Sequence, residues 1–447
     1  MATSAVDLRT TRPAVSGPGR WIDGWDPEDH AQWEGGGRPV ARRNLVLSVF
    51  AEFLGFAVWA LWSIVVPQLG GVGFDLSVDQ QFWLVSVPAL VGATLRLPYT
   101  FAVPIFGGRN WTVVSALLLV VPSGALAWVV TRPETSFGVL LAVAALAGFG
   151  GGNFASSMAN ISFFYPEREK GKALGLNAAG GNIGTAAVQL AVPLVIVTGA
   201  GVALDRAGLM FIPLALLAAV LAWRFMDNLT SARADYRAFG TAARNRHTWI
   251  ISFLYIGTFG SFIGYSGAFP TLLRTQFPEV GLSIAFTGAL VGSLARPAGG
   301  ILADRWGGGT TTIASFAVMA AGALGALQGL RSHSFALFVG SFLVLFVATG
   351  VGNGATYRMI PAVFRAGAVE GGQLATARKA AAGCIGIAGA VGAFGGFLIP
   401  RGFALSTSVT GDLQAALAVF VGVYLVMLVT TWAVYVRPRA PMAAERV

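Results

Sequence analysis

The stretch GATLRLPYTFAVPIFGG at residues 92–108 is matched 200 positions later by GSLARPAGGILADRWGG at residues 292–308. Each copy places an arginine, Arg96 or Arg296, inside an apolar segment, and a pair of glycines follows eleven residues after it. An arginine at the same place in two apolar segments indicates an internal repeat of a membrane helix and its following loop.

A second pair of landmarks keeps the same offset of 200 residues. Asn153 ends the string GFGGGN, and Asn353 ends the string TGVGN. Several landmarks in one register predict two homologous halves, an arrangement that secondary transporters use to build one central site.

The composition requires lipid as the surrounding medium. Of the 447 residues, 55% are hydrophobic and only 11% are charged. Soluble domains carry roughly 25% charged residues and seldom exceed about 300 residues, so this apolar sequence has no aqueous core large enough to bury it. We therefore expect an all-α membrane protein.

Twelve apolar runs of about 20 residues are each long enough to cross about 30 Å of hydrocarbon. They lie at about 44–68, 80–105, 111–131, 137–164, 172–199, 207–226, 248–273, 283–303, 310–330, 334–363, 380–401 and 413–435. An even number of spans returns both termini to one side of the membrane.

The basic residues give the orientation, because Lys and Arg are retained in cytoplasmic loops. With both termini inside, 22 of the 30 fall in tails and inner loops, five fall outside, and Arg96, Arg296 and Arg358 fall within the membrane. The longest polar connection after the N-terminal segment follows the sixth span. We expect a cytosolic tail over 1–43, a six-helix bundle over 44–226, a cytoplasmic linker over 227–247, a second bundle over 248–435 and a cytosolic tail over 436–447.

The two repeated arginines are the candidate site. An arginine at the bilayer centre costs about 2.5–3.5 kcal/mol on insertion scales, so it is expected either to form an ion pair or to serve the function of the protein. Glu52 is the only carboxylate in the apolar runs and cannot neutralise three arginines. We expect Arg96 and Arg296 to face each other across a cavity that holds an anion, and their planar forks favour an oxyanion.

Other classes of function find little support. An enzyme or a metal site would need clustered acids, bases or thiols, but Cys384 is the single cysteine and the three histidines lie outside the apolar runs. We expect no catalytic activity, no cofactor, no metal and no nucleic-acid partner. An anion channel could use the same arginines, although conduction favours weak binding at several sites.

Longer motifs resemble a known family. The fourth and fifth spans read GFGGGNFASSMANISFFYPEREKGKALGLNAAGGNIG, the seventh begins YIGTFGSFIGYSGAF, the eleventh ends GAVGAFGGFLIP, and WDPEDHAQW precedes the first. These strings resemble the nitrate/nitrite porter family of the major facilitator superfamily, whose NarK-type members have twelve helices in two pseudo-symmetric halves. The resemblance runs from about residue 25 to residue 435.

The resemblance implies a substrate site for nitrate. Its expected members are Arg96 and Arg296 as the clamp, Phe149 and Phe259 above and below the ion, and Tyr255 and Asn177 as hydrogen-bonding partners. Tyr255 and Phe259 are one helical turn apart and so share a face. Aromatic faces repel anions, so the rings would act by forming a flat slot that excludes tetrahedral ions. The alternatives are that the rings only pack and that Asn177 only bonds across helices.

A further set is expected to couple or gate transport. Asp304 and Arg305 fit the inner-loop signature of the superfamily and resemble a conformational latch, and Asn153 and Asn353 occupy repeated positions.

Glu52 and Arg358 lie at similar depth, about 13 and 10 Å from the inner surface at ~1.5 Å per residue. We expect them to form a structural ion pair. The alternative is that Glu52 carries protons.

The sequence therefore predicts a monomeric, multi-pass transporter of the cytoplasmic membrane that serves nitrate assimilation. We expect it to move nitrate and nitrite by alternating access, as an antiporter that exchanges one for the other. Proton-coupled nitrate symport and an anion channel are the alternatives.

Overall fold

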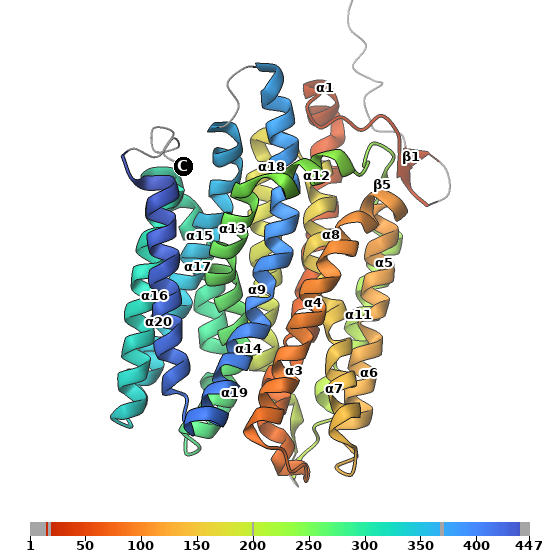
Figure 1. Cartoon of the computed structure of the whole chain (residues 1–447). Helices are drawn as coiled ribbons and strands as arrows, with labels where there is room; N and C mark the ends of the chain where they lie inside the picture. The colour runs from red at the N-terminus through yellow and green to blue at the C-terminus, as the bar shows by residue number, and fades with distance from the viewer. Residues whose placement is uncertain (1–14, 17–18, 199–200, 367–370, 439–447) are drawn as a thin grey trace, which may run out of the picture.

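A computed structural model describes residues 15–16, 19–198, 201–366 and 371–438 of the chain. Long helices run side by side between the two ends of one bundle (Figure 1). In the described part, eleven helices are long and apolar enough to cross a membrane, and a helix pair bent by 42° at Ala60 makes a twelfth span. The expected all-α membrane fold with twelve spans is confirmed.

Six spans form the first half, several of them broken into two helices. They are α2 (Arg38–Trp59) with α3 (Leu61–Val65) and η3 (Val66–Val72), α4 (Val78–Phe106), α5 (Gly108–Leu118) with α6 (Val120–Val129), α7 (Phe137–Leu146) with α8 (Gly148–Phe164), α9 (Glu167–Ile196), and α10 (Arg206–Leu209) with α11 (Phe211–Phe225).

The second half has six further spans. They are α13 (Arg246–Tyr255) with η4 (Ile256–Gly260) and α14 (Ser261–Gln276), η5 (Leu282–Ile284) with α15 (Phe286–Trp306), α16 (Gly308–Arg331), α17 (Phe335–Ala366), α18 (Gly371–Ala393) with α19 (Gly395–Thr410), and α20 (Gln414–Thr431) with η6 (Trp432–Val436). Outside the spans lie β1 (Val15–Ser16), β2 (Trp21–Ile22), α1 (His30–Gln32), η2 (Trp33–Gly37), β3 (Val197–Thr198), β4 (Gly201–Val202), β5 (Asn228–Leu229) and α12 (Tyr236–Arg244).

The helices that carry the two arginines end in the same way. α4 stops before Gly107, whose φ is 87°, and α15 stops before Gly307, whose φ is 89°. Glycine adopts this left-handed region without steric cost, which explains why each repeated stretch ends in a glycine pair. The N-terminus of α4 is fixed by a capping box between Ser77 and Gln80.

The two halves meet along matching pairs of helices. α4 of the first half packs against α18 and α19 of the second, and α9 packs against α15. β1, α12 and the C-terminal end of the described chain lie at one end of the bundle (Figure 1). The helices α4 and α15, which bear the arginines, are therefore both at the boundary between the halves.

The segment before the first span is folded onto the bundle. We call residues 19–37 the N-terminal cap. Its strand β2 pairs in parallel with β5, which follows the sixth span, and Trp25 and Trp33 are buried against Phe164 and Tyr165 at the end of α8. The motif WDPEDHAQW thus covers the connection between α8 and α9. The first membrane helix, α2, begins at Arg38, six residues before the predicted start of the first span.

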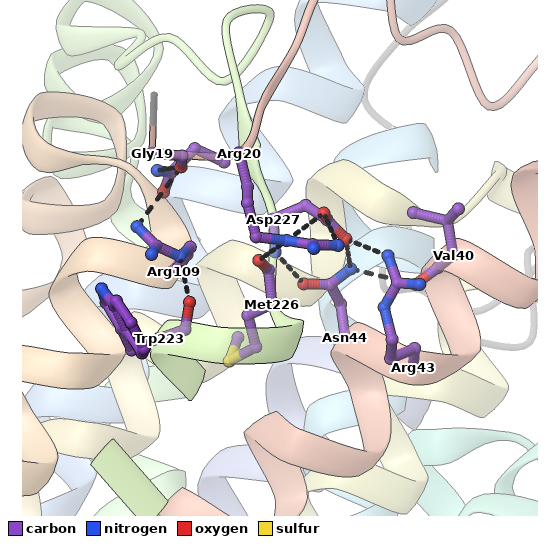
Figure 2. A network of polar contacts seen from close by, with 10 residues as sticks. Gly19, Arg20, Val40, Arg43, Asn44, Arg109, Trp223, Met226 and Asp227 are labelled. Carbon is purple, nitrogen blue, oxygen red and sulfur yellow. Dashed lines mark hydrogen bonds and ion pairs between the residues drawn. The ribbon is translucent and has the colours of Figure 1, made fainter. Parts of the chain in front are cut away.

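A buried carboxylate joins the cap to two membrane helices (Figure 2). Asp227 follows α11 and accepts hydrogen bonds from Arg20 of the cap at 2.8 Å, from Arg43 of α2 at 2.5 Å and from Asn44 of α2 at 2.8 Å. The backbone N–H of Asp227 donates in turn to the Asn44 side chain at 2.9 Å. Asp227 is fully buried, whereas its two arginine partners are partly exposed.

This network predicts that Asp227→Ala loosens the cap. The substitution leaves Arg20, Arg43 and Asn44 without their shared acceptor, which should cost about 1–3 kcal/mol of unfolding free energy. Limited trypsin digestion should then cut after Arg20 at least tenfold faster than in the unaltered protein. Glu279→Gln, at an exposed loop, is the control. Unchanged digestion of Asp227→Ala would show that the Asp227 network does not hold the cap in place.

Candidate anion-binding site

Arg96 lies in the middle of α4 with its side chain fully buried. Its Nε donates to the carbonyl of Gly151 on α8 at 3.1 Å, and one terminal nitrogen donates to the carbonyl of Gly389 on α18 at 2.7 Å. The second contact crosses from one half of the protein to the other. The other terminal nitrogen, Nη2, is buried and has no hydrogen-bond partner in the structure.

Arg296 occupies the equivalent place in α15 and is 6% exposed. Its Nη2 donates to the hydroxyl of Tyr255 at 3.5 Å, while its Nη1 is buried without a partner. No carboxylate of the described residues forms an ion pair with Arg96 or Arg296. Each guanidinium therefore keeps one donor nitrogen free for a ligand.

Phe154 of α8 is the ring that both arginines share. The Cζ of Arg96 lies 4.5 Å and the Cζ of Arg296 5.8 Å from its centroid. Phe154 also stacks on Phe259 of the second half, with centroids 6.0 Å apart and an interplanar angle of 26°. The guanidiniums thus meet at one aromatic surface that has a ring from each half.

Phe149, expected in this place, lies elsewhere. Its side chain is partly exposed and is not among the rings that contact either guanidinium in the described part of the chain. Five residues of helix rotate the side chain by about 140°, so Phe149 and Phe154 cannot share a face. In the described chain the ring that contacts both guanidiniums is therefore Phe154 and not Phe149. The glycines do not separate the two rings, because Gly151 and Gly152 both meet α4, one three residues before Phe154 and the other three residues after Phe149.

Phe259 and Tyr255 lie beside the arginines. The Phe259 centroid is 4.8 Å from the Cζ of Arg96, and the ring stacks on Tyr255 at 5.2 Å. The Tyr255 hydroxyl donates to Oδ1 of Asn353 at 2.8 Å. Asn353, expected only as a coupling or gating residue, is thus joined to Arg296 through Tyr255.

Buried donors without acceptors gather around these side chains. The Nη2 of Arg96, the Nη1 of Arg296 and the amide nitrogen of Asn353 are all in this state. Buried polar groups are normally hydrogen-bonded, because an unpaired one costs about 1–3 kcal/mol. Unpaired donors on and beside two cations make this a candidate site for an acceptor that carries negative charge.

Asn177 lies next to Glu52 in the first half. Its amide nitrogen donates to Oε2 of Glu52 and, at 2.7 Å, to the hydroxyl of Ser157, and its own carbonyl oxygen has no partner. Glu52 of α2 is fully buried, and its Oε1 faces Gly181 of α9, where a Cβ would come within 2.4 Å. This carboxyl group therefore sits in a tight pocket between α2, α8 and α9.

The expected ion pair between Glu52 and Arg358 is wrong. The Nε of Arg358 contacts Oδ1 of Asp304 at 2.6 Å, and both side chains are more than half exposed. Counting along helices gives depth but no direction around the bundle, and α17, which carries Arg358, packs against α15. α15 continues to Trp306, so Asp304 lies in its last turn and not in a loop. Arg305 is exposed beside it.

Further contacts cross between the halves on the side away from the cap. Gln189 of α9 donates to the carbonyl of Ser266 on α14 at 2.7 Å. Closer to that end, Arg401 of α19 pairs with Asp79 of α4 at 2.9 Å and lies 4.1 Å above the Trp83 ring. On the side away from the cap, contacts between the two halves thus close off the arginine site.

Comparison with known proteins places the chain in a family. The family model described as Major Facilitator Superfamily matches residues 47–369. A nitrate/nitrite transporter, NarU, of Salmonella typhimurium is 41% identical over 93% of this chain and 96% of its own length. The chain belongs to the nitrate/nitrite porter family of the Major Facilitator Superfamily.

Other relatives and structures agree with this placement. The probable nitrate/nitrite antiporter NarK2 of Thermus thermophilus is 36% identical to the porter over 95% of this chain and 98% of its own length. A crystal structure of a D-xylose-proton symporter aligns with a TM-score of 0.67 at 14% identity, covering 91% of this chain and 99% of that one. The structural likeness supports the fold, and the sequence relatives support the family.

The geometry predicts different roles for two phenylalanines of α8. Phe154→Ala removes the ring that both guanidiniums contact, so the porter should bind nitrate about tenfold more weakly, equivalent to ~1.4 kcal/mol. Phe149→Ala is the matched control and should change the affinity less than twofold. Isothermal titration of nitrate into the purified protein measures both. A loss of binding in Phe149→Ala alone would contradict the assignment.

Proposed function

We propose that the porter exchanges nitrate for nitrite across the cytoplasmic membrane by alternating access. The observation that carries this proposal is the pair Arg96 and Arg296, each with one buried guanidinium nitrogen lacking a partner, around a ring that both contact. Two converging cations without a carboxylate between them are suited to bind one anion. The substrate, in this account, completes the neutralisation of the site.

The shape of the site favours a planar ion. Phe154 and Phe259 bring aromatic surfaces beside the guanidiniums, and Arg96 contacts both rings. Trigonal nitrate and bent nitrite fit edge-on to an arginine fork and flat against a ring, whereas tetrahedral sulfate and phosphate present oxygens in every direction. The names of the relatives refer to nitrate and nitrite and point to the same substrates.

The placement of the arginines on different halves supports alternating access. Arg96 belongs to the first half but donates to Gly389 of the second. A substrate that competes for the guanidinium of Arg96 would weaken this link between the halves when it binds. Binding and rocking of the halves are then coupled through one side chain.

The membrane potential favours exchange over uniport. Carrying one anion into a negative cell costs about 2.3 kcal/mol per 100 mV. Exchange of nitrate for nitrite moves no net charge and needs no titrating group in the protein. The basic residues of the inner loops support a cytoplasmic location for the N-terminal cap and for the end of the described chain.

Proton-coupled nitrate symport is the second candidate, and Glu52 is the observation that favours it. Its carboxyl group is fully buried, one of its oxygens lacks a partner, and it contacts Asn177, which is proposed to bind substrate. No ion pair among the described residues compensates a charge on Glu52, so a bound proton would neutralise it. Among the described membrane carboxylates, Glu52 is the one positioned beside the site.

Reconstituted vesicles separate the two couplings. Vesicles preloaded with nitrite should take up labelled nitrate at least tenfold faster than empty vesicles, and an inward proton gradient alone should give no accumulation. Glu52→Gln, which keeps the shape of the side chain, should retain exchange within twofold, as should the exposed control Glu134→Gln. Accumulation driven by protons and abolished in Glu52→Gln would instead establish symport. Uptake without internal nitrite that carries a steady current would indicate a channel.

A further inference from the structure

A second group of arginines lies at the surface, far along the chain from the substrate arginines. A cavity of about 530 Å³ opens between the first turns of α2 and the end of α11. Its polar wall consists of Arg38, Arg42 and Arg43. Its apolar wall contains Val46, Leu47 and Phe225.

The two walls lie at different heights along α2. The arginines occupy the first two turns of α2. Val46 and Leu47 follow about one turn later, at 1.5 Å per residue. Val46 is 58% exposed and Phe225 is 42% exposed, so neither is covered by protein. The cavity therefore changes from cationic to apolar in the direction of the membrane interior, which is the polarity profile of a phospholipid.

The positive charge of the cavity is only partly neutralised. Arg38 pairs with Glu169 at 2.9 Å, but Glu169 is also approached by Arg168 at 3.9 Å. Arg43 pairs with Asp227, which already binds Arg20 (Figure 2). Both carboxylates are thus shared between two cations.

Arg42 supplies an unshared positive charge. Its side chain is exposed, and no ion pair joins it to a carboxylate in the described ranges of the chain. Arg42 is also four residues from Arg38 on the same helix face, where two like charges repel. An added anion would relieve this repulsion.

The aromatic side chains set the depth of the cavity. Trp223, two residues before Phe225 on α11, is 59% exposed at the end of the bundle that carries the N-terminal cap. Exposed tryptophans gather where lipid headgroups meet the hydrocarbon core. Trp223 and Phe225 at the end of α11 therefore lie near the boundary between headgroups and hydrocarbon, with the arginines of the first two turns of α2 at headgroup level and Val46 on the acyl-chain side.

We propose that this cavity binds an anionic phospholipid of the inner leaflet. The guanidinium of Arg42, with Arg38 and Arg43 beside it, holds the headgroup phosphate, and an acyl chain lies along Val46 and Phe225. Arginine forks match phosphate oxygens in pairs, and basic pockets between helices on the cytoplasmic side are typical sites for such lipids. The bound lipid would tie α2 to α11 next to the Asp227 network.

Lipid titration of the purified porter tests this site. Phosphatidylglycerol should raise the thermal unfolding temperature of the unaltered protein by several degrees, whereas phosphatidylcholine and inorganic phosphate should not. The double variant Arg38→Gln/Arg42→Gln should bind phosphatidylglycerol at least tenfold more weakly by native mass spectrometry. Arg42→Lys, which keeps the charge, should lose less than Arg42→Gln. Arg365→Gln, an exposed arginine at the end of α17, is the matched control.

Each outcome decides the proposal. Equal binding of phosphatidylglycerol by the double variant and the control would overturn it, and so would equal stabilisation by phosphatidylcholine. Stabilisation by inorganic phosphate alone would show a free-phosphate site and no lipid site. Monodisperse size-exclusion profiles and unchanged nitrate exchange in the variants would show that a loss of lipid binding is not a loss of folding.

Discussion

Two guanidinium groups buried in a membrane bundle, with too few carboxylates to neutralise them, are the constraint on which the rest of this structure depends. Arg96 and Arg296 are held by carbonyl oxygens, by a tyrosine hydroxyl and by aromatic rings, none of which carries a formal charge. The nearest membrane carboxyl, Glu52, bonds to Asn177 and forms no ion pair with either arginine in the described chain. In the proposed function, an anion of matching shape neutralises the two guanidiniums, and its departure leaves them without a counter-ion again.

The architecture suits the proposed sharing of one ion between the two halves. Each arginine lies on a helix at the boundary between the halves, and the terminal nitrogens left free belong one to each half. Phe154 and Phe259 extend the same principle, because each half contributes one ring to the stack. Contacts farther from the cap, such as Asp79 with Arg401, then have to form and break as the halves rock about the site.

The sequence predicted the twelve spans from hydropathy and the two equivalent arginines from the repeat, whereas Tyr255 and Phe259 came from the family resemblance and their spacing of one helical turn. It did not predict features that depend on the direction of a side chain around the bundle. Phe149 was expected in place of Phe154, and Arg358 was expected to contact Glu52 although its neighbour is Asp304. The position of a residue along a helix gives its depth in the membrane but not the side of the helix on which its side chain lies. The folded N-terminal cap was missed because its short strands and buried tryptophans lack the periodicity of a helix.

A double-mutant cycle on nitrate binding tests most directly whether the two arginines hold the same ion. Isothermal titration of the unaltered porter, Arg96→Lys, Arg296→Lys and the double variant gives the four affinities and the stoichiometry. The account predicts one nitrate per chain and strong non-additivity, with either single change removing most of the binding energy and the second adding little. Two nitrates per chain, or losses that simply add, would contradict it.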